Sequence, residues 1–155
     1  MTRFSPSMST KATTKRPSPR RARSISLVSA SLPILRRSNP VRSFVDVDGL
    51  KRVNDRDGHA AGDHVLRTLA ATLRSNLRSF DPIVRYGGDE FVCGLSGVDP
   101  ESVERRFGTI DQALQDAVGV GITVGLASLL PNDTLDKLIS RADAALLDGK
   151  RRRDE

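Results

Sequence analysis

PIVRYGGDEFVCGL, residues 82–95, contains two short runs of β-forming residues that are separated by only four residues, GGDE. Two such runs around a turn that contains glycine are typical of a β-hairpin. The turn of this hairpin carries two adjacent carboxylates, Asp89 and Glu90. The rest of the chain must therefore supply both the strands that complete a sheet and a reason for this negative charge.

The periodicity of the flanking residues predicts the other elements. VRSFVDVD (41–48) alternates like a strand and ends in carboxylates, and VGVGITVGLAS (118–128) predicts a last strand. Apolar residues at helical spacing predict amphipathic helices through residues 65–77, 103–114 and 135–146, with Asp63 in the first turn of the first helix. The stretch between about 49 and 62 is rich in Asp and Gly and is predicted to be a loop.

The resulting order is βαββαβα, which limits the possible topologies. Two right-handed crossovers build an α+β fold, with an antiparallel sheet of ferredoxin-like or polymerase-palm-like type and the helices packed mainly on one face. The first and third strands are then neighbours at the centre of the sheet. The end of the first strand, with Asp46 and Asp48, should lie beside the hairpin turn with Asp89 and Glu90 at one edge.

Such a gathering of carboxylates needs a counter-charge. Two carboxylates about 4 Å apart repel by about 4 kcal/mol at an effective dielectric near 20. Hard oxygen ligands suit Mg²⁺ or Mn²⁺, and sites of this kind carry out phosphoryl or nucleotidyl transfer. Gly87 and Gly88 allow positive φ and place no side chain between the backbone and an anion, so that phosphates can approach closely. The alternative is an ordinary surface turn with two solvated acids.

Charge divides the chain into two parts. Residues 1–40 are rich in Ser, Pro and Arg, and the first acidic residue of the chain is Asp46, from which point there are 15 basic and 19 acidic residues, a net charge of −4. We expect a basic, disordered leader (1–40) followed by one folded domain (41–153). With few aromatic residues the leader is not expected to bind nucleic acid specifically. One cysteine and the lack of a long apolar run favour a cytoplasmic protein without a transmembrane segment.

Three segments together carry a resemblance to a known family. FVDVDGLKRVNDRDGHAAGD (44–63), RSFDPIVRYGGDEF (78–91) and RADAALLDGK (141–150) resemble the catalytic domain of the GGDEF family of diguanylate cyclases, bacterial enzymes that join two GTP molecules into cyclic di-GMP. The resemblance extends over most of the chain after residue 40. It implies catalysis across a homodimer, because each domain would bind one GTP.

The resemblance also implies roles for individual residues. It implies that Asp46, Asp89 and the carbonyl of Val47 hold the metal ions, that Glu90 assists in activating the ribose hydroxyl, and that Lys51 lies near the phosphates. It further implies that Gly87 and Gly88 line the substrate site, that Asn54 and Asp63 contact guanine, and that Lys150 reaches the triphosphate. Arg78 and Asp81, spaced RxxD before the turn, match the product-inhibition site that binds cyclic di-GMP.

Some positions depart from the family pattern. Residues 24–43 contain nothing equivalent to the family's DxLTGLxNRR signature, Gly49 replaces a bulky residue, and Leu147 stands where the family usually has Tyr. Arg153 is a weak match for the arginine that contacts phosphate. The alternative function is therefore a truncated or inactive domain that binds GTP or cyclic di-GMP as a regulatory module. Cys93 alternates with Phe91 and Leu95 and is expected to pack in the core.

Overall fold

The structure is a computed structural model that describes residues 41–130 and 132–154. Its elements follow the order β1 (Val41–Val47), α3 (Leu50–Asp57), α4 (His59–Asn76), β2 (Ile83–Arg85), β3 (Glu90–Leu95), α5 (Pro100–Val118), β4 (Ile122–Ser128) and α6 (Leu135–Asp154). The prediction of a disordered leader at 1–40 concerns residues outside this part.

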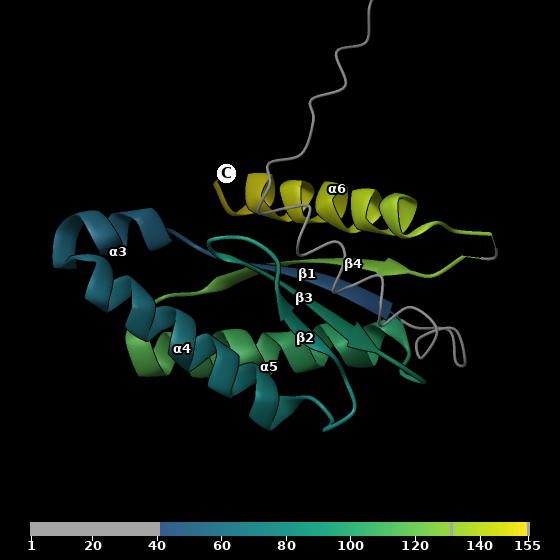
Figure 1. Ribbon diagram of the computed structural model, residues 1–155, viewed down its shortest axis with the longest axis horizontal. Coiled ribbons are helices and arrows are strands. Elements are labelled where there is room, and N and C mark those ends of the chain that lie inside the picture. The colour runs from purple at the N-terminus through teal and green to yellow at the C-terminus, as the bar shows by residue number, and fades with distance from the viewer. Residues whose placement is uncertain (1–40, 131, 155) are drawn as a thin grey trace, which may run out of the picture.

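The four strands form one antiparallel sheet in the order β2-β3-β1-β4. This order places the first and third strands at the centre, as the connection rules predict, and confirms the α+β, palm-like fold class. The crossover helices α4 and α5 cover one face of the sheet, while α6 lies across the opposite face (Figure 1). The sheet is therefore sandwiched, with two helices on one side and one on the other.

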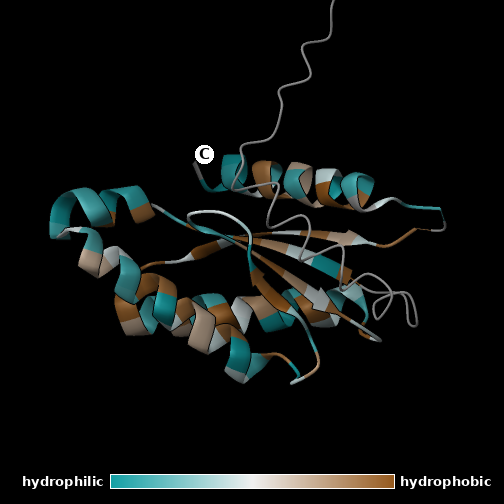
Figure 2. Cartoon of the chain, in the orientation of Figure 1, coloured by the Kyte–Doolittle hydropathy of each residue, from teal (hydrophilic) through white to brown (hydrophobic). Residues whose placement is uncertain are grey.

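Because side chains alternate along β1, this strand contributes residues to two hydrophobic cores, one on each face of the sheet. Val45 and Val47 join the core beneath α4 and α5, whereas Phe44 joins a smaller core beneath α6. In that smaller core the Phe44 and Tyr86 rings meet edge to face, with centroids 5.3 Å apart. Hydrophobic residues accordingly lie along the strands and on the facing sides of α4 and α5 (Figure 2). Cys93 is buried in the larger core as predicted, and burial raises the pKa of its thiol to about 12.

The prediction of a loop between residues 49 and 62 is wrong. Residues Leu50–Asp57 form helix α3, and α4 begins at His59, so Asp63 is not in the first turn of its helix. Gly49 (φ 68°) and Gly58 (φ 83°) both have left-handed backbone, which separates the two helices from each other and from β1. Only Leu50 of α3 is buried, so a polar composition was compatible with a helix that lies at the surface.

Helix α6 approaches the sheet closely at one glycine. A Cβ atom at Gly125 in β4 would lie 2.1 Å from the carbonyl oxygen of Ala142 and 2.4 Å from the amide nitrogen of Leu146. Leu138, Ala142 and Leu146 are buried on the same side of α6. The last turns of α6 are thus fixed over the end of the sheet at which β1 leads into α3 (Figure 1).

Among the described residues, no helix combines the length and apolar character needed to cross a bilayer.

We predict that Gly125→Ala lowers the free energy of unfolding by about 3 kcal/mol or more, because the new methyl group would overlap backbone atoms that cannot move independently. The control is Gly108→Ala in α5, where a Cβ would meet nothing within 4 Å. That variant should be stabilised by about 0.5–1 kcal/mol. Urea denaturation of both variants measures the difference, and equal stability of the two would contradict the close approach.

Candidate active site

The end of β1 lies between the hairpin turn and the start of β4. Asp46 pairs with Glu90 across the β1–β3 ladder, and the amide of Val47 donates to the carbonyl of Asp89 over 3.2 Å. The next amide, that of Asp48, donates to the carbonyl of Gly121 over 3.0 Å. The backbone thus brings the two acidic segments together at one edge, as the topology predicts.

Asp46 is a buried carboxylate whose counter-charge comes from α6. Its side chain is only 9% exposed, and Nζ of Lys150 lies 2.8 Å from its Oδ1. Burial raises the pKa of Asp46, the Lys150 ammonium opposes that rise, and the negative charges of Asp89 and Asp48 add to it. Burial lowers the pKa of Lys150, but its hydrogen bond to Asp46 and the three carboxylates outweigh burial and raise it. Asp46 therefore belongs to an acidic cluster in which Lys150 supplies its direct counter-charge.

Asp48 is satisfied by a second set of partners. The hydroxyl of Thr123 in β4 donates to Asp48 Oδ1 over 2.6 Å, and the guanidinium of Arg153 forms an ion pair with Oδ2. A cavity of about 340 Å³ opens among these groups. Its lining consists of Asp46, Asp48, Gly49, Arg52, Thr123, Lys150 and Arg153.

The hairpin turn is held by hydrogen bonds rather than by left-handed glycines. Gly87 and Gly88 do not use the positive φ that glycine allows. The side chain of Arg85 donates to the carbonyls of Gly87 (3.3 Å) and Gly88 (2.6 Å). The Glu90 side chain lies close over Gly87, so a Cβ at position 87 would displace the Glu90 carboxylate. Sequence reasoning missed Arg85, which the periodicity marked only as a strand residue.

The two predicted guanine-contacting residues lie close together on α3 and α4. A Cβ at Gly62 would lie 2.0 Å from Oδ1 of Asn54, so the Asn54 side chain packs directly against the residue that precedes Asp63. Asp63 borders a cavity of about 430 Å³ between α4 and β2, which also contacts Arg67, Arg74 and Arg85. Lys51 is exposed in the first turn of α3.

The side chains of Arg78 and Asp81, the two residues of the RxxD motif, do not form an ion pair with each other. Asp81 is buried and its Oδ2 accepts from the backbone amide of Arg78 over 3.0 Å, while Oδ1 has no hydrogen-bond partner. The guanidinium of Arg78 donates to the carbonyl of Ser96 and lies against the Phe80 ring. Arg105 and Arg106 of α5 share a cavity of about 480 Å³ with Arg78. No local sequence pattern pointed to these two arginines, because they are far from the motif along the chain.

Comparison with known proteins assigns this arrangement to a family. A family model described as "Diguanylate cyclase, GGDEF domain" matches residues 30–155. The chain belongs to the GGDEF domain family. It is 35% identical to the diguanylate cyclase DgcZ of Escherichia coli over 127 residues, which is 75% of this chain and 43% of DgcZ. It is 40% identical to TpbB of Pseudomonas aeruginosa over 119 residues, 70% of this chain and 27% of TpbB.

Solved GGDEF structures agree with the fold. The GGDEF domain of TpbB superposes with a TM-score of 0.71 at 32% identity, covering 85% of this chain and 84% of that one. A microbial GGDEF domain described in its interaction with cyclic di-GMP superposes with a TM-score of 0.72 at 30% identity, covering 86% and 87%. The chain spans less than half the length of the curated relatives named above.

The donor set at this GGDEF site fits a hard divalent cation. Asp46, Asp89 and the backbone carbonyls at the end of β1 are oxygen donors of the kind that Mg²⁺ prefers. Burial raises the pKa of Asp46 and the charges of Asp89 and Asp48 add to that rise, and a bound cation would oppose both effects. Within residues 41–130 and 132–154, no three His, Cys, Asp or Glu side chains are already arranged to hold an ion. Lys150 and Arg153 instead neutralise Asp46 and Asp48. An ion would therefore have to compete with Lys150 for Asp46.

We predict that Lys150→Met makes the stability of the domain fall more steeply as pH rises. The pKa of Asp46 is raised above its ordinary value of 3.8, so its ionisation costs folding free energy as pH increases through the folded-state pKa. Without Lys150 this cost has no offset, and we expect a loss of about 1–2 kcal/mol at pH 7, less than for a fully buried pair because Lys150 is 39% exposed.

Melting temperatures between pH 4 and 8 measure this loss. The difference between wild type and Lys150→Met should be small at pH 4, where Asp46 is protonated in part, and should grow toward pH 7. Lys137→Met, on the exposed side of the same helix, should show a constant offset. A constant offset for Lys150→Met as well would contradict the coupling.

Proposed function

We propose that this GGDEF domain is a diguanylate cyclase that condenses two GTP molecules into cyclic di-GMP and two pyrophosphates. The observation that carries the proposal is the placement of buried Asp46 opposite the hairpin turn, with Lys150 beside it. A buried carboxylate next to two further acids is costly for folding, and a nucleotide–metal complex is a ligand that would use it. The family membership supports the same reaction.

The residues would divide the work as follows. Asp46, Asp89 and the carbonyl of Val47 would hold Mg²⁺ or Mn²⁺, which when bound neutralises phosphate charge and favours ionisation of the attacking hydroxyl. Glu90, folded over Gly87, would accept the proton of the ribose 3′ hydroxyl. Lys51 and Lys150 would offset negative charge on the phosphates. Gly87 and Gly88 would leave the turn without side chains that obstruct the substrate.

Selection of GTP would rest on the α3–α4 junction. Asn54 offers both a donor and an acceptor and Asp63 offers an acceptor, which together match the edge of guanine. The two residues lie on adjacent helices, with the Asn54 side chain against Gly62, and Asp63 borders the cavity that Arg85 also lines. We infer that guanine enters at this junction and that the phosphates extend toward the hairpin turn.

Stoichiometry requires two domains. The 3′ oxygen of each GTP attacks the α-phosphorus of the other, so that two P–O bonds form, two break and two pyrophosphates leave. One site holds one GTP, and therefore two domains must face each other with their turns opposed. Catalysis would then consist of positioning and electrostatic stabilisation. We propose that residues 41–153 form this catalytic domain, with 1–40 as a separate basic leader, and that it acts in the cytoplasm, where GTP is available.

A turnover assay tests the proposed reaction. The full chain fused to a dimeric coiled coil should convert GTP to cyclic di-GMP in the presence of Mg²⁺, and Asp89→Ala should reduce the rate by at least about 100-fold, as is common when a group that stabilises the transition state is removed. Chromatography of the nucleotides measures the product. A fusion that forms no cyclic dinucleotide and behaves as Asp89→Ala does would contradict the proposal.

The cluster of three arginines at the RxxD motif favours a second function. Arg78, Arg105 and Arg106 border one cavity, and guanidinium groups bind phosphates and the O6 and N7 edge of guanine. We propose that cyclic di-GMP binds here, either as product that inhibits a cyclase or as the signal read by an inactive regulatory domain. Asp81 would fix the backbone of Arg78 rather than contact the ligand through both oxygens.

Calorimetry separates this function from turnover. Arg78→Ala should weaken cyclic di-GMP binding by about 10-fold or more, because a charged hydrogen bond is worth about 1.5–3 kcal/mol. Arg151→Ala, an exposed arginine on α6, should bind as wild type does. Unchanged affinity in Arg78→Ala would exclude the RxxD site. Binding without turnover in the enforced dimer would favour the regulatory module.

A further inference from the structure

Arg153 joins three elements at the end of the sheet that carries the acidic cluster. Its NH1 forms an ion pair with Asp48, just past β1, and its NH2 lies 3.2 Å from Oδ2 of Asp111 on α5. Arg153 itself belongs to the last turn of α6. A rigid guanidinium that engages two carboxylates from different elements restrains all three more than a single ion pair does.

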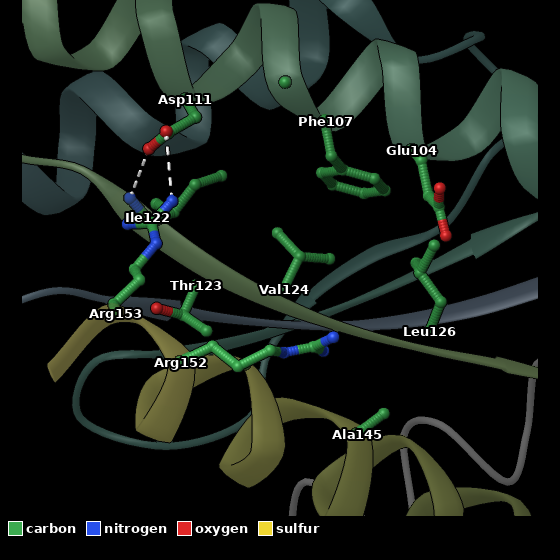
Figure 3. A pocket seen from close by; sticks show the side chains of 12 residues that line it. Glu104, Phe107, Asp111, Ile122, Thr123, Val124, Leu126, Ala145, Arg152 and Arg153 are labelled. Carbon is green, nitrogen blue, oxygen red and sulfur yellow. Dashed lines mark hydrogen bonds and ion pairs between the residues drawn. The ribbon is translucent and has the colours of Figure 1, made fainter. Parts of the chain in front are cut away.

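The Asp111 carboxylate is itself held in place. Its Oδ1 accepts from the amide of Ile122 over 2.6 Å, where β4 begins, and its Oδ2 accepts from Gln115 over 3.0 Å. A Cβ at Gly121 would lie 3.0 Å from Asp111 Oδ1 and 3.3 Å from NH1 of Arg153. Figure 3 shows Asp111 pointing from α5 toward both Ile122 and Arg153. The backbone at the start of β4 therefore holds the Asp111 carboxylate in place, and this carboxylate in turn holds Arg153.

Arg153 and Lys150 occupy the same side of α6. They are three residues apart, which places them one above the other on a helix, and both border the cavity that contains Asp46 and Asp48. Asp111 is absent from the lining of that cavity and borders a separate one of about 400 Å³ between α5 and α6. A change at Asp111 is therefore expected to reach a ligand of the acidic cluster without contact, through Arg153, through the fold or through the loss of its charge. Loss of that negative charge alone would favour an anionic ligand, so weaker binding would point to Arg153 or the fold.

We propose that Arg153 is a positioning residue, which ties the last turn of α6 to Asp111 and Asp48 and thereby holds Lys150 at the acidic cluster. The consequence of this role rests on the proposed function: Lys150 is held where it can contact the triphosphate of GTP. We assign Arg153 to positioning rather than to phosphate binding, because each of its two terminal nitrogens is engaged by a carboxylate. Its role is to limit the motion of the α6 terminus.

A double-mutant cycle tests this role in the full chain. Calorimetry measures the binding of a non-hydrolysable GTP analogue with Mg²⁺. The single variants are Arg153→Met, Asp111→Asn and Lys150→Met. The double variants combine Lys150→Met with Arg153→Met or with Asp111→Asn. Asn at 111 can still accept from the Ile122 amide but loses the charge that holds Arg153. Arg152→Met is the matched control, because Arg152 borders the cavity between α5 and α6 and does not line the one that contains Asp46 and Asp48.

We expect Arg153→Met and Asp111→Asn each to weaken binding by about 3- to 10-fold, the range of a partly exposed ion pair. In the Lys150→Met background neither should weaken it further, because non-additivity marks residues that act through one another. If Arg153→Met weakens binding further in the Lys150→Met background while Asp111→Asn does not, the proposal is overturned, because Arg153 would then contact the phosphates directly. Lower melting temperatures with unchanged affinity would overturn it in favour of a purely structural role.

Hydrogen exchange separates failure of this inference from failure of the proposed function. Amides of residues 147–154 should exchange faster in Arg153→Met and Asp111→Asn than in wild type or Arg152→Met, in the absence of any nucleotide. Wild-type protein that binds no GTP analogue but shows this difference would refute the proposed substrate and leave the tether supported. Exchange that is the same in all variants would refute the tether itself.

Discussion

The pairing register of β1 is the constraint on which the site depends. Asp46 lies opposite Glu90 on β3 and opposite Thr123 on β4. Because side chains alternate along a strand, a slip of one residue would turn Val45 and Val47 out of the larger core and Asp46 into it. The hydrophobic pattern of the strand thus sets the position of its carboxylates, and the stability of the core maintains the acidic end of the sheet.

Helix α6 completes this end of the sheet by supplying cations. Its close approach at Gly125 and its buried face over Phe44 and Tyr86 set its height above β4. Lys150 then reaches Asp46, and Arg153 reaches Asp48 and Asp111. Without these pairs the acids would repel one another in a partly buried environment. The charges that we propose to bind a nucleotide–metal complex are in this way balanced by ion pairs within the protein.

Much of this arrangement could be predicted from the sequence. Alternation in β1, β3 and β4 and the helical spacing in α4 and α5 determined the topology, and the topology required Asp46 and Asp89 to meet. Helix α3 could not be predicted from periodicity, because its only apolar residues, Leu50 and Val53, are too few to show a helical repeat. The hydrogen bonds of Arg85 to the turn and the clustering of Arg105 and Arg106 with Arg78 depend on tertiary contacts, which a local pattern does not encode.

The central claim is that Asp46 and Asp89, from separate strands, hold one cation cluster to which GTP binds. A crystal structure of the protein with Mg²⁺ and a non-hydrolysable GTP analogue tests it most directly. We predict that an ion lies between the two carboxylates and that Lys150 has moved from Asp46 to the triphosphate. A bound nucleotide with no ion at these carboxylates, and with Lys150 still paired to Asp46, would contradict the claim.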